Sequence, residues 1–225
     1  MLLFALCGAN SIYEGWRSRN FLKTLKGEIV YVTGRSLGEV YKIKASGEDN
    51  QFLYHNPRFT VDYIRWQDDG RIQFLVSMGN SALPTGNEYK LVTMDSDGKN
   101  VKMDELPLQP RGDEASGERF QKYVDQLFKI ERLNGLPYGL QIHDGLYVFQ
   151  GSVIYLAENG KLVKVYNHMF YDLKFNRGPD TAVWSPDKKF IAYNNGIKGL
   201  TITDRKGSIK VNLPVVRAAA FDWKY

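Results

Sequence analysis

Tryptophans at a repeated position are the first residues in this sequence that could carry chemistry. Trp66, Trp184 and Trp223 each lie at or near the end of a short strand-like run. Aromatic rings of this kind stack on sugars or bases when they face solvent. The apolar residues beside them favour packing between sheets instead. We therefore expect the three indole rings to be buried.

Histidines and acidic turns are the residues that could hold a metal. His55, His143 and His168 are isolated from one another and form no metal-binding motif. The turn Asp95-Ser96-Asp97-Gly98 begins like a calcium loop, but the distal glutamate of a twelve-residue loop is absent. A tight hairpin turn explains it better. We predict no metal site and no cofactor.

Two carboxylates could serve a glycan-cleaving enzyme, which needs a pair of them close together. Asp62 and Asp180 both lie near the start of a strand-like run. The sequence contains no nucleophile elbow, phosphate loop or dinucleotide fingerprint. Arg111-Gly112-Asp113 spells the integrin-binding tripeptide, which chance explains in so short a match. We expect a protein that is not an enzyme, with a glycan-binding or glycan-cleaving protein as an alternative.

Short strands must position these residues. Four strand-like runs follow one another near the C-terminus, at 182–184, 190–193, 200–203 and 209–211. They are separated by tight turns, including Ser185-Pro186-Asp187 and Asp204-Arg205-Lys206-Gly207. Four short strands joined by tight turns indicate one antiparallel meander. The same order recurs over residues 29–54, 61–103 and 140–165.

The turn after Trp184 carries a family resemblance. Trp184-Ser185-Pro186-Asp187 resembles the W-S-P-D-G-K turn of TolB-like and WD-repeat β-propellers, with Lys188 at the position of the family's glycine. The resemblance implies an all-β fold, a small β-propeller. The meanders recur at close to the roughly 40 residues typical of one blade. We expect four blades of four antiparallel strands, with a fifth blade hidden in 105–137 or an open fan completed by a partner subunit as alternatives.

The two ends of the repeat region should complete one blade together. Ala218–Tyr225 has the pattern of a first strand without a second, and the first meander lacks its first strand. We therefore expect Phe221 and Trp223 to lie in a strand paired with Glu28–Thr33, which would close the ring and remove exposed sheet edges. We expect the propeller to span 28–225, with a helical insertion at 105–137 whose helix covers Glu118–Leu133.

The N-terminal segment, residues 1–27, has two interpretations. Cys7 follows Met1–Leu6, an apolar run that would be the remnant of a lipoprotein signal with Cys7 acylated. Alternatively, residues 1–7 pack on the domain as an edge strand. A short helix is expected within 8–27. No apolar run is long enough for a transmembrane helix.

Function is expected in the loops. The chain has 225 residues, 43% of them hydrophobic, and a net charge of +5 without a block of like charges, so nucleic acid is not the favoured partner. In propellers, loops such as 55–60, 77–87, 150–152 and 168–180 gather on one face. They carry residue types enriched at binding hot spots: Arg58, His168, Phe170, Tyr171 and Arg177.

The resemblance and the lack of catalytic motifs together predict a non-catalytic protein-interaction scaffold in a larger bacterial assembly. Its expected location is extracytoplasmic, in the periplasm or at the outer membrane. The alternative is a structural component of a phage virion or secretion machine.

Overall fold

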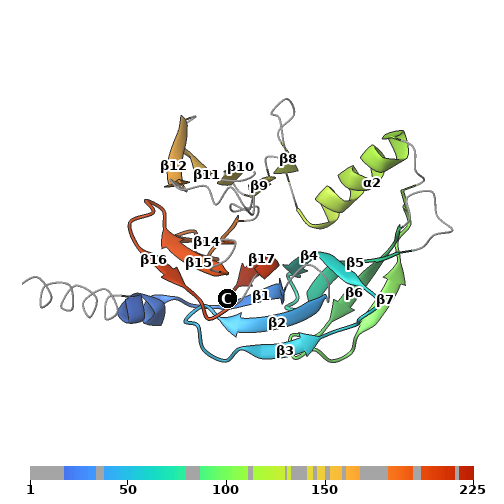
Figure 1. Cartoon of the computed structure of the whole chain (residues 1–225), viewed down its shortest axis with the longest axis horizontal. Helices are drawn as coiled ribbons and strands as arrows, with labels where there is room; N and C mark the ends of the chain where they lie inside the picture. The colour runs from blue at the N-terminus through green and yellow to red at the C-terminus, as the bar shows by residue number, and fades with distance from the viewer. Residues whose placement is uncertain are drawn as a thin grey trace, which may run out of the picture.

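The fold is a small β-propeller built from antiparallel sheets (Figure 1). The computed structural model describes residues 18–33, 38–79, 87–110, 114–129, 131–132, 141–143, 146–149, 153–158, 161–167, 182–194, 199–215 and 218–225. These residues form four sheets. The expectation that the ring contains four blades stays a prediction.

The first sheet joins the two ends of the described chain. Its strands lie in the order β17 (Ala218–Lys224), β1 (Glu28–Thr33), β2 (Glu39–Lys44) and β3 (Gln51–Tyr54). Trp223 is opposite Ile29 and Phe221 is opposite Tyr31. The Trp223 ring is buried, and its Nε1 donates a hydrogen bond to the carbonyl of Lys26 at 2.9 Å. The expected closing strand pair is confirmed.

The second sheet contains β4 (Thr60–Trp66), β5 (Ile72–Gly79), β6 (Asn87–Met94) and β7 (Lys102–Glu105) in that order. The expected loop over 77–87 is wrong at its ends. Ser77 pairs with Tyr89, and the ladder continues to Gly79 opposite Asn87. Pairing between β5 and β6 satisfies the hydrogen bonds of their backbone groups. The hairpin therefore extends beyond the apolar run from which it was predicted.

The third sheet has one strand more than expected. It contains β8 (Glu131–Arg132), β9 (Gln141–His143), β10 (Leu146–Phe149), β11 (Val153–Glu158) and β12 (Lys161–Asn167), with β8 on the edge beside β9. The fourth sheet has the expected strands, β13 (Ala182–Trp184), β14 (Phe190–Asn194), β15 (Leu200–Asp204) and β16 (Lys210–Asn212).

The inserted helix, α2, covers Glu114–Leu127 rather than Glu118–Leu133. Lys129 has a φ of 54°, the left-handed conformation that ends many helices, so residues 131–132 are free to enter β8. Phe120, Val124 and Phe128 lie on one helix face and pack with Leu75 of β5. The expectation of a helix lying on the propeller is confirmed, with corrected bounds.

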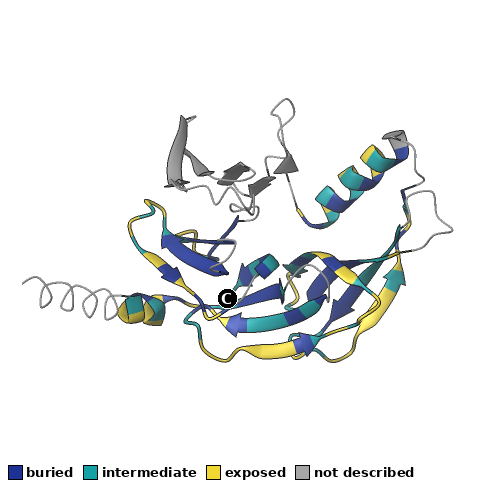
Figure 2. Ribbon diagram, in the orientation of Figure 1, coloured by how far each residue is buried: buried dark blue, intermediate teal, exposed yellow. Residues whose placement is uncertain are grey.

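Alternating residues of β1 explain why the first sheet sits between two others. Ile29 and Tyr31 pack with the fourth sheet, whereas Val30 and Val32 pack with the second. Period-two alternation places these pairs on opposite faces of one strand. Figure 2 accordingly shows β1 buried, while β3 is largely exposed.

Residues 18–24 are helical and pack on the same core; they lie within the 8–27 segment where a helix is expected. Phe21 and Leu25 are buried. The Phe21 ring contacts Phe190 of β14 edge to face, with centroids 5.2 Å apart. The helix therefore lies against the fourth sheet.

Candidate functional site

The predicted loop cluster falls mostly outside the described residues. Arg58 is described: it is exposed in the turn after β3, and its backbone N–H donates to Asn56 Oδ1 at 3.0 Å. The other four residues of the cluster are His168, Phe170, Tyr171 and Arg177, and none of them is described. Cys7, Asp180 and the tripeptide 111–113 also lie outside the described ranges. The binding role of these loops stays a prediction.

Asp62, one of the two candidate carboxylates, lies on β4 and hydrogen-bonds to Ser77. The surrounding protein keeps part of the water away from this carboxyl group, and this desolvation raises its pKa. The hydrogen bond with Ser77 opposes the rise. The side chain nevertheless keeps an exposed surface, so we expect water to limit the effect. Among the described ranges, no three His, Cys, Asp or Glu side chains gather as a metal site.

The three tryptophans are buried, as expected, with exposed fractions of 8%, 8% and 6% for Trp66, Trp184 and Trp223. A cationic side chain lies over the ring of two of them, Lys224 over Trp66 and Arg205 over Trp184. Lys224 Nζ lies 3.7 Å from the Trp66 ring centroid, and burial lowers the pKa of this lysine. Asp222 Oδ2 accepts the backbone N–H of Trp66 at 2.7 Å. These contacts hold β17 against β4.

The outer strands form a second candidate surface, which sequence reasoning missed. We call it the outer rim: strands β3 and β7 with Phe52, Val101 and Met103. These three side chains are 57%, 45% and 38% exposed, although large apolar residues are usually inside. In the described part of the chain, β3 and β7 each pair with a single neighbour. The rim therefore combines exposed apolar side chains with strand edges that are open among the described residues; Figure 2 shows how much of β3 and β7 is exposed.

Contacts beneath the rim fix its shape. Tyr31 stacks on Tyr41 with centroids 5.5 Å apart, and Tyr41 meets Phe52 edge to face at 5.5 Å. Gly98, with a φ of 81°, sits so close to β3 that a Cβ there would lie 2.6 Å from the Leu53 carbonyl oxygen. The turn before β7 thus packs directly on β3. A single exposed Phe on a strand forms no motif, so the sequence gives no signal for it.

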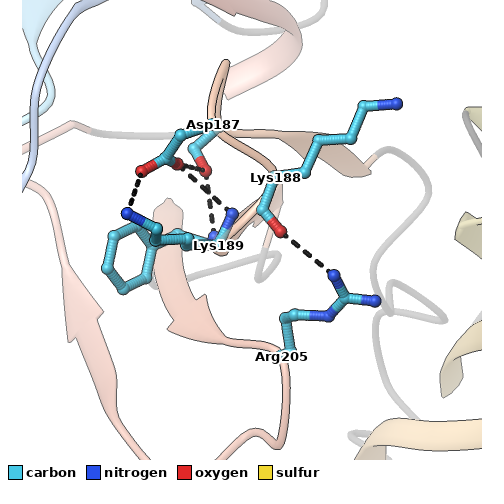
Figure 3. Close-up of polar contacts among 6 residues, drawn as sticks. Asp187, Lys188, Lys189 and Arg205 are labelled. Carbon is cyan, nitrogen blue, oxygen red and sulfur yellow. Dashed lines mark hydrogen bonds and ion pairs between the residues drawn. The ribbon is translucent and has the colours of Figure 1, made fainter.

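The hairpin turn between β13 and β14 presents cations on a rigid frame (Figure 3). Asp187 Oδ1 accepts hydrogen bonds from Ser185 Oγ at 2.7 Å and from the Lys189 backbone N–H at 3.2 Å. Although burial alone would raise it, these contacts and the Lys189 ammonium lower the pKa of Asp187. Arg205 Nη1 donates to the Lys188 carbonyl at 3.4 Å, and its guanidinium lies 5.1 Å from the Trp184 ring centroid.

No known family model matches the chain, and no curated protein sequence matches it. The chain is similar at low identity to solved structures that include a TolB, a candidate 6-phosphogluconolactonase and YCF48. TolB from Acinetobacter baumannii is 12% identical with a TM-score of 0.46, and the match covers 88% of this chain but 66% of TolB, just under two thirds. A candidate 6-phosphogluconolactonase from Bacteroides fragilis is 11% identical with a TM-score of 0.31, covering 84% and 81% of the two chains. YCF48 bound to D1 peptide is 12% identical with a TM-score of 0.26, covering 89% and 50%.

The propeller fold rests on the four antiparallel sheets and the closing strand pair, and these likenesses add no argument to it. No helix in the described ranges is long and apolar enough to cross a membrane.

Proposed function

We propose that this chain is a non-catalytic protein-interaction module of a larger extracytoplasmic assembly, and that its outer rim binds the partner. The exposed apolar side chains of the rim carry the proposal. Phe52, Val101 and Met103 stand beside strand edges that have no partner among the described residues. Exposed apolar groups mark interaction surfaces, and an open edge accepts an added strand.

An extended polypeptide is the ligand whose chemistry fits the rim. Its backbone N–H and C=O groups would pair with those of β3 or β7, and its alternate side chains would cover the apolar residues. Met103 is flexible and polarizable, which suits a contact with varied side chains. The stacked tyrosines beneath Phe52 fix its ring before binding, which reduces the entropy lost on association.

The proposed location rests on the resemblance of the Trp184–Asp187 turn to TolB-like propellers and on the interpretation of Cys7 as an acylated residue. A virion component makes the opposite prediction for Cys7. Mass spectrometry of the mature N-terminus in the native cell separates the two. A lipid-modified Cys7 supports the extracytoplasmic location, and an unprocessed Met1 contradicts it.

Site-specific photo-crosslinking in native cells tests the interaction itself. A photoreactive residue at position 103 should yield a discrete crosslinked protein, whereas one at Lys122, which is exposed on α2, should not. Phe52→Ser should abolish the crosslink at position 103 while the far-UV spectrum stays unchanged. If both positions crosslink the same proteins, or position 103 crosslinks none, the rim is not the binding surface.

A further inference from the structure

A face rich in cations lies where the helix over residues 18–24 packs on the fourth sheet. We call it the basic face, and its six exposed cationic residues are Arg19, Lys23, Lys188, Lys189, Arg205 and Lys206. They come from three segments: the helix over residues 18–24 and the two tight hairpin turns of the fourth sheet. The net charge of +5 looked dispersed in the sequence because these segments are far apart along the chain.

Two contacts and the strand directions bring the segments together. The ring contact between Phe21 and Phe190 places the helix beside the β13–β14 turn. The hydrogen bond from Arg205 to the Lys188 carbonyl joins that turn to the β15–β16 turn. Both turns lie at the same end of the sheet, because β13 and β15 run in the same direction. Figure 1 shows the helix and the fourth sheet at the same side of the molecule.

The acidic residues on this face point their charge at the protein itself. Asp187 is held by Ser185 and Lys189, as described above. Asp204 Oδ1 accepts the backbone N–H groups of Ser208 at 2.6 Å and Ile209 at 3.3 Å. These carboxylates organise the turns, and Asp187 also forms an ion pair with Lys189 at 3.3 Å. Two acids therefore offset part of the charge of the six cations and leave the face basic.

A neighbouring turn, after β2, adds both signs of charge. Glu48 and Asp49 are exposed there, and Asp49 forms an ion pair with Lys44. With two acids and one lysine, this turn lowers the excess of cations by one charge, and the basic face keeps its positive sign.

We propose that the basic face binds the anionic headgroups of a phospholipid surface. Its cations lie on hairpin tips and on the outer side of a helix, so they meet a flat surface rather than the groove that a nucleic-acid backbone would follow. The exposed large apolar side chains of the described chain, Phe52, Val101, Met103 and Tyr225, belong to other segments. A protein interface usually needs such anchors, whereas attraction to anionic lipid needs cations alone.

The position of the face in the chain fits this partner. Arg19 and Lys23 follow Cys7 after a short stretch of sequence. If Cys7 is acylated, the basic face supplies the second attachment that a single acyl chain requires for stable membrane binding. The inference does not depend on acylation or on the outer rim, and it can be tested with the unmodified chain.

Vesicle sedimentation of the purified full chain is the test. We expect binding to vesicles of phosphatidylglycerol and phosphatidylcholine in equal amounts, no binding to phosphatidylcholine alone, and release in high salt. Each cation near an anionic surface raises partitioning roughly fivefold. Reversing Lys188, Lys189 and Lys206 to Glu should therefore lower partitioning by roughly a hundredfold or more.

A matched control reverses three exposed lysines elsewhere, Lys99, Lys102 and Lys122, and should lower partitioning far less. A second variant, Lys23→Glu with Lys206→Glu, leaves the β13–β14 turn intact and should also bind weakly, so a folding defect in the triple variant cannot decide the result. Failure of the wild-type chain to bind anionic vesicles overturns the proposal. Equal losses in variant and control, or tighter binding to duplex DNA than to vesicles at the same salt, overturn it as well.

Discussion

At the scale of single residues, Lys188 shows how the sequence and the structure complement each other. The resemblance to propeller turns gave this position as the family's glycine, and the structure gives Lys188 a φ of 55°. The left-handed conformation costs about 1–2 kcal/mol for a residue that has a Cβ, and glycine avoids this cost. The sequence shows that Lys188 replaces the family's glycine. It does not show whether the turn changes shape to suit lysine or keeps the strained left-handed conformation.

Lys188→Gly should raise the free energy of unfolding by about 0.5–1 kcal/mol, because relief of the left-handed strain exceeds the added entropy of the unfolded chain. Chemical denaturation of the two proteins measures the change. Lys189→Gly is the matched control: Lys189 is not among the residues with positive φ, so glycine there should lower stability by a similar amount. Equal effects of the two substitutions would show that the turn is not strained.

Tyr31 should make the stability of the protein depend on alkaline pH. Its side chain is 2% exposed, its hydroxyl donates to Asn50 Oδ1 at 2.8 Å, and burial raises its pKa from 10.0 to about 12. The unfolded chain loses this proton at lower pH than the folded one. The stabilisation is therefore complete below about pH 10 and is lost as the pH rises to about 12.

The loss should amount to about 2–3 kcal/mol across that window. Unfolding free energies of the wild type and of Tyr31→Phe, measured at a series of alkaline pH values, isolate it, since the remaining tyrosines titrate in both proteins. The difference between the two should shrink as the pH rises. A constant difference would mean that the Tyr31 hydroxyl is solvated.

At the scale of elements, periodicity found α2 but misplaced its ends. The apolar spacing from Phe120 to Phe128 identifies the buried face, which packs on Tyr63 and Tyr89 of the second sheet. The sequence placed the stop at Asn134-Gly135, whereas the left-handed residue is Lys129. A lysine in that conformation has no sequence signal, so β8 was absorbed into the expected helix. The ends of the strands were predicted more closely than those of α2, because turn residues mark where each strand-like run begins and ends.

Gly117 lies inside α2, and a Cβ there would have no heavy atom within 4 Å. Gly117→Ala should therefore raise the free energy of unfolding by up to about 1 kcal/mol, through helix propensity alone. Thermal and urea unfolding of the variant check this. Gly98→Ala should act oppositely and lose about 1 kcal/mol or more, because its φ is 81° and the Leu53 carbonyl blocks the Cβ. A neutral Gly117→Ala would place that segment outside a stable helix.

At the scale of the whole molecule, the ring closure was predictable and the surfaces were not. Ala218–Lys224 has the pattern of a first strand, and β1 supplies its only matching partner in the first meander. The basic face depends on how the helix over 18–24 docks on the fourth sheet, through Phe21 and Leu25 in the shared core and the ring contact of Phe21 with Phe190. The outer rim depends on which apolar residues the sheets leave uncovered. Both are decided by packing between segments distant in sequence, which no local pattern contains.

Hydrogen–deuterium exchange of the full chain tests the closed ring most directly. Pairing of β17 with β1, together with the Trp66–Asp222 hydrogen bond, predicts that peptides covering 218–224 exchange as slowly as those covering 28–33, in one cooperative opening. Exchange of 218–224 at the rate of an unstructured chain, while 28–33 stays protected, would contradict the closure and the placement of every blade beside it.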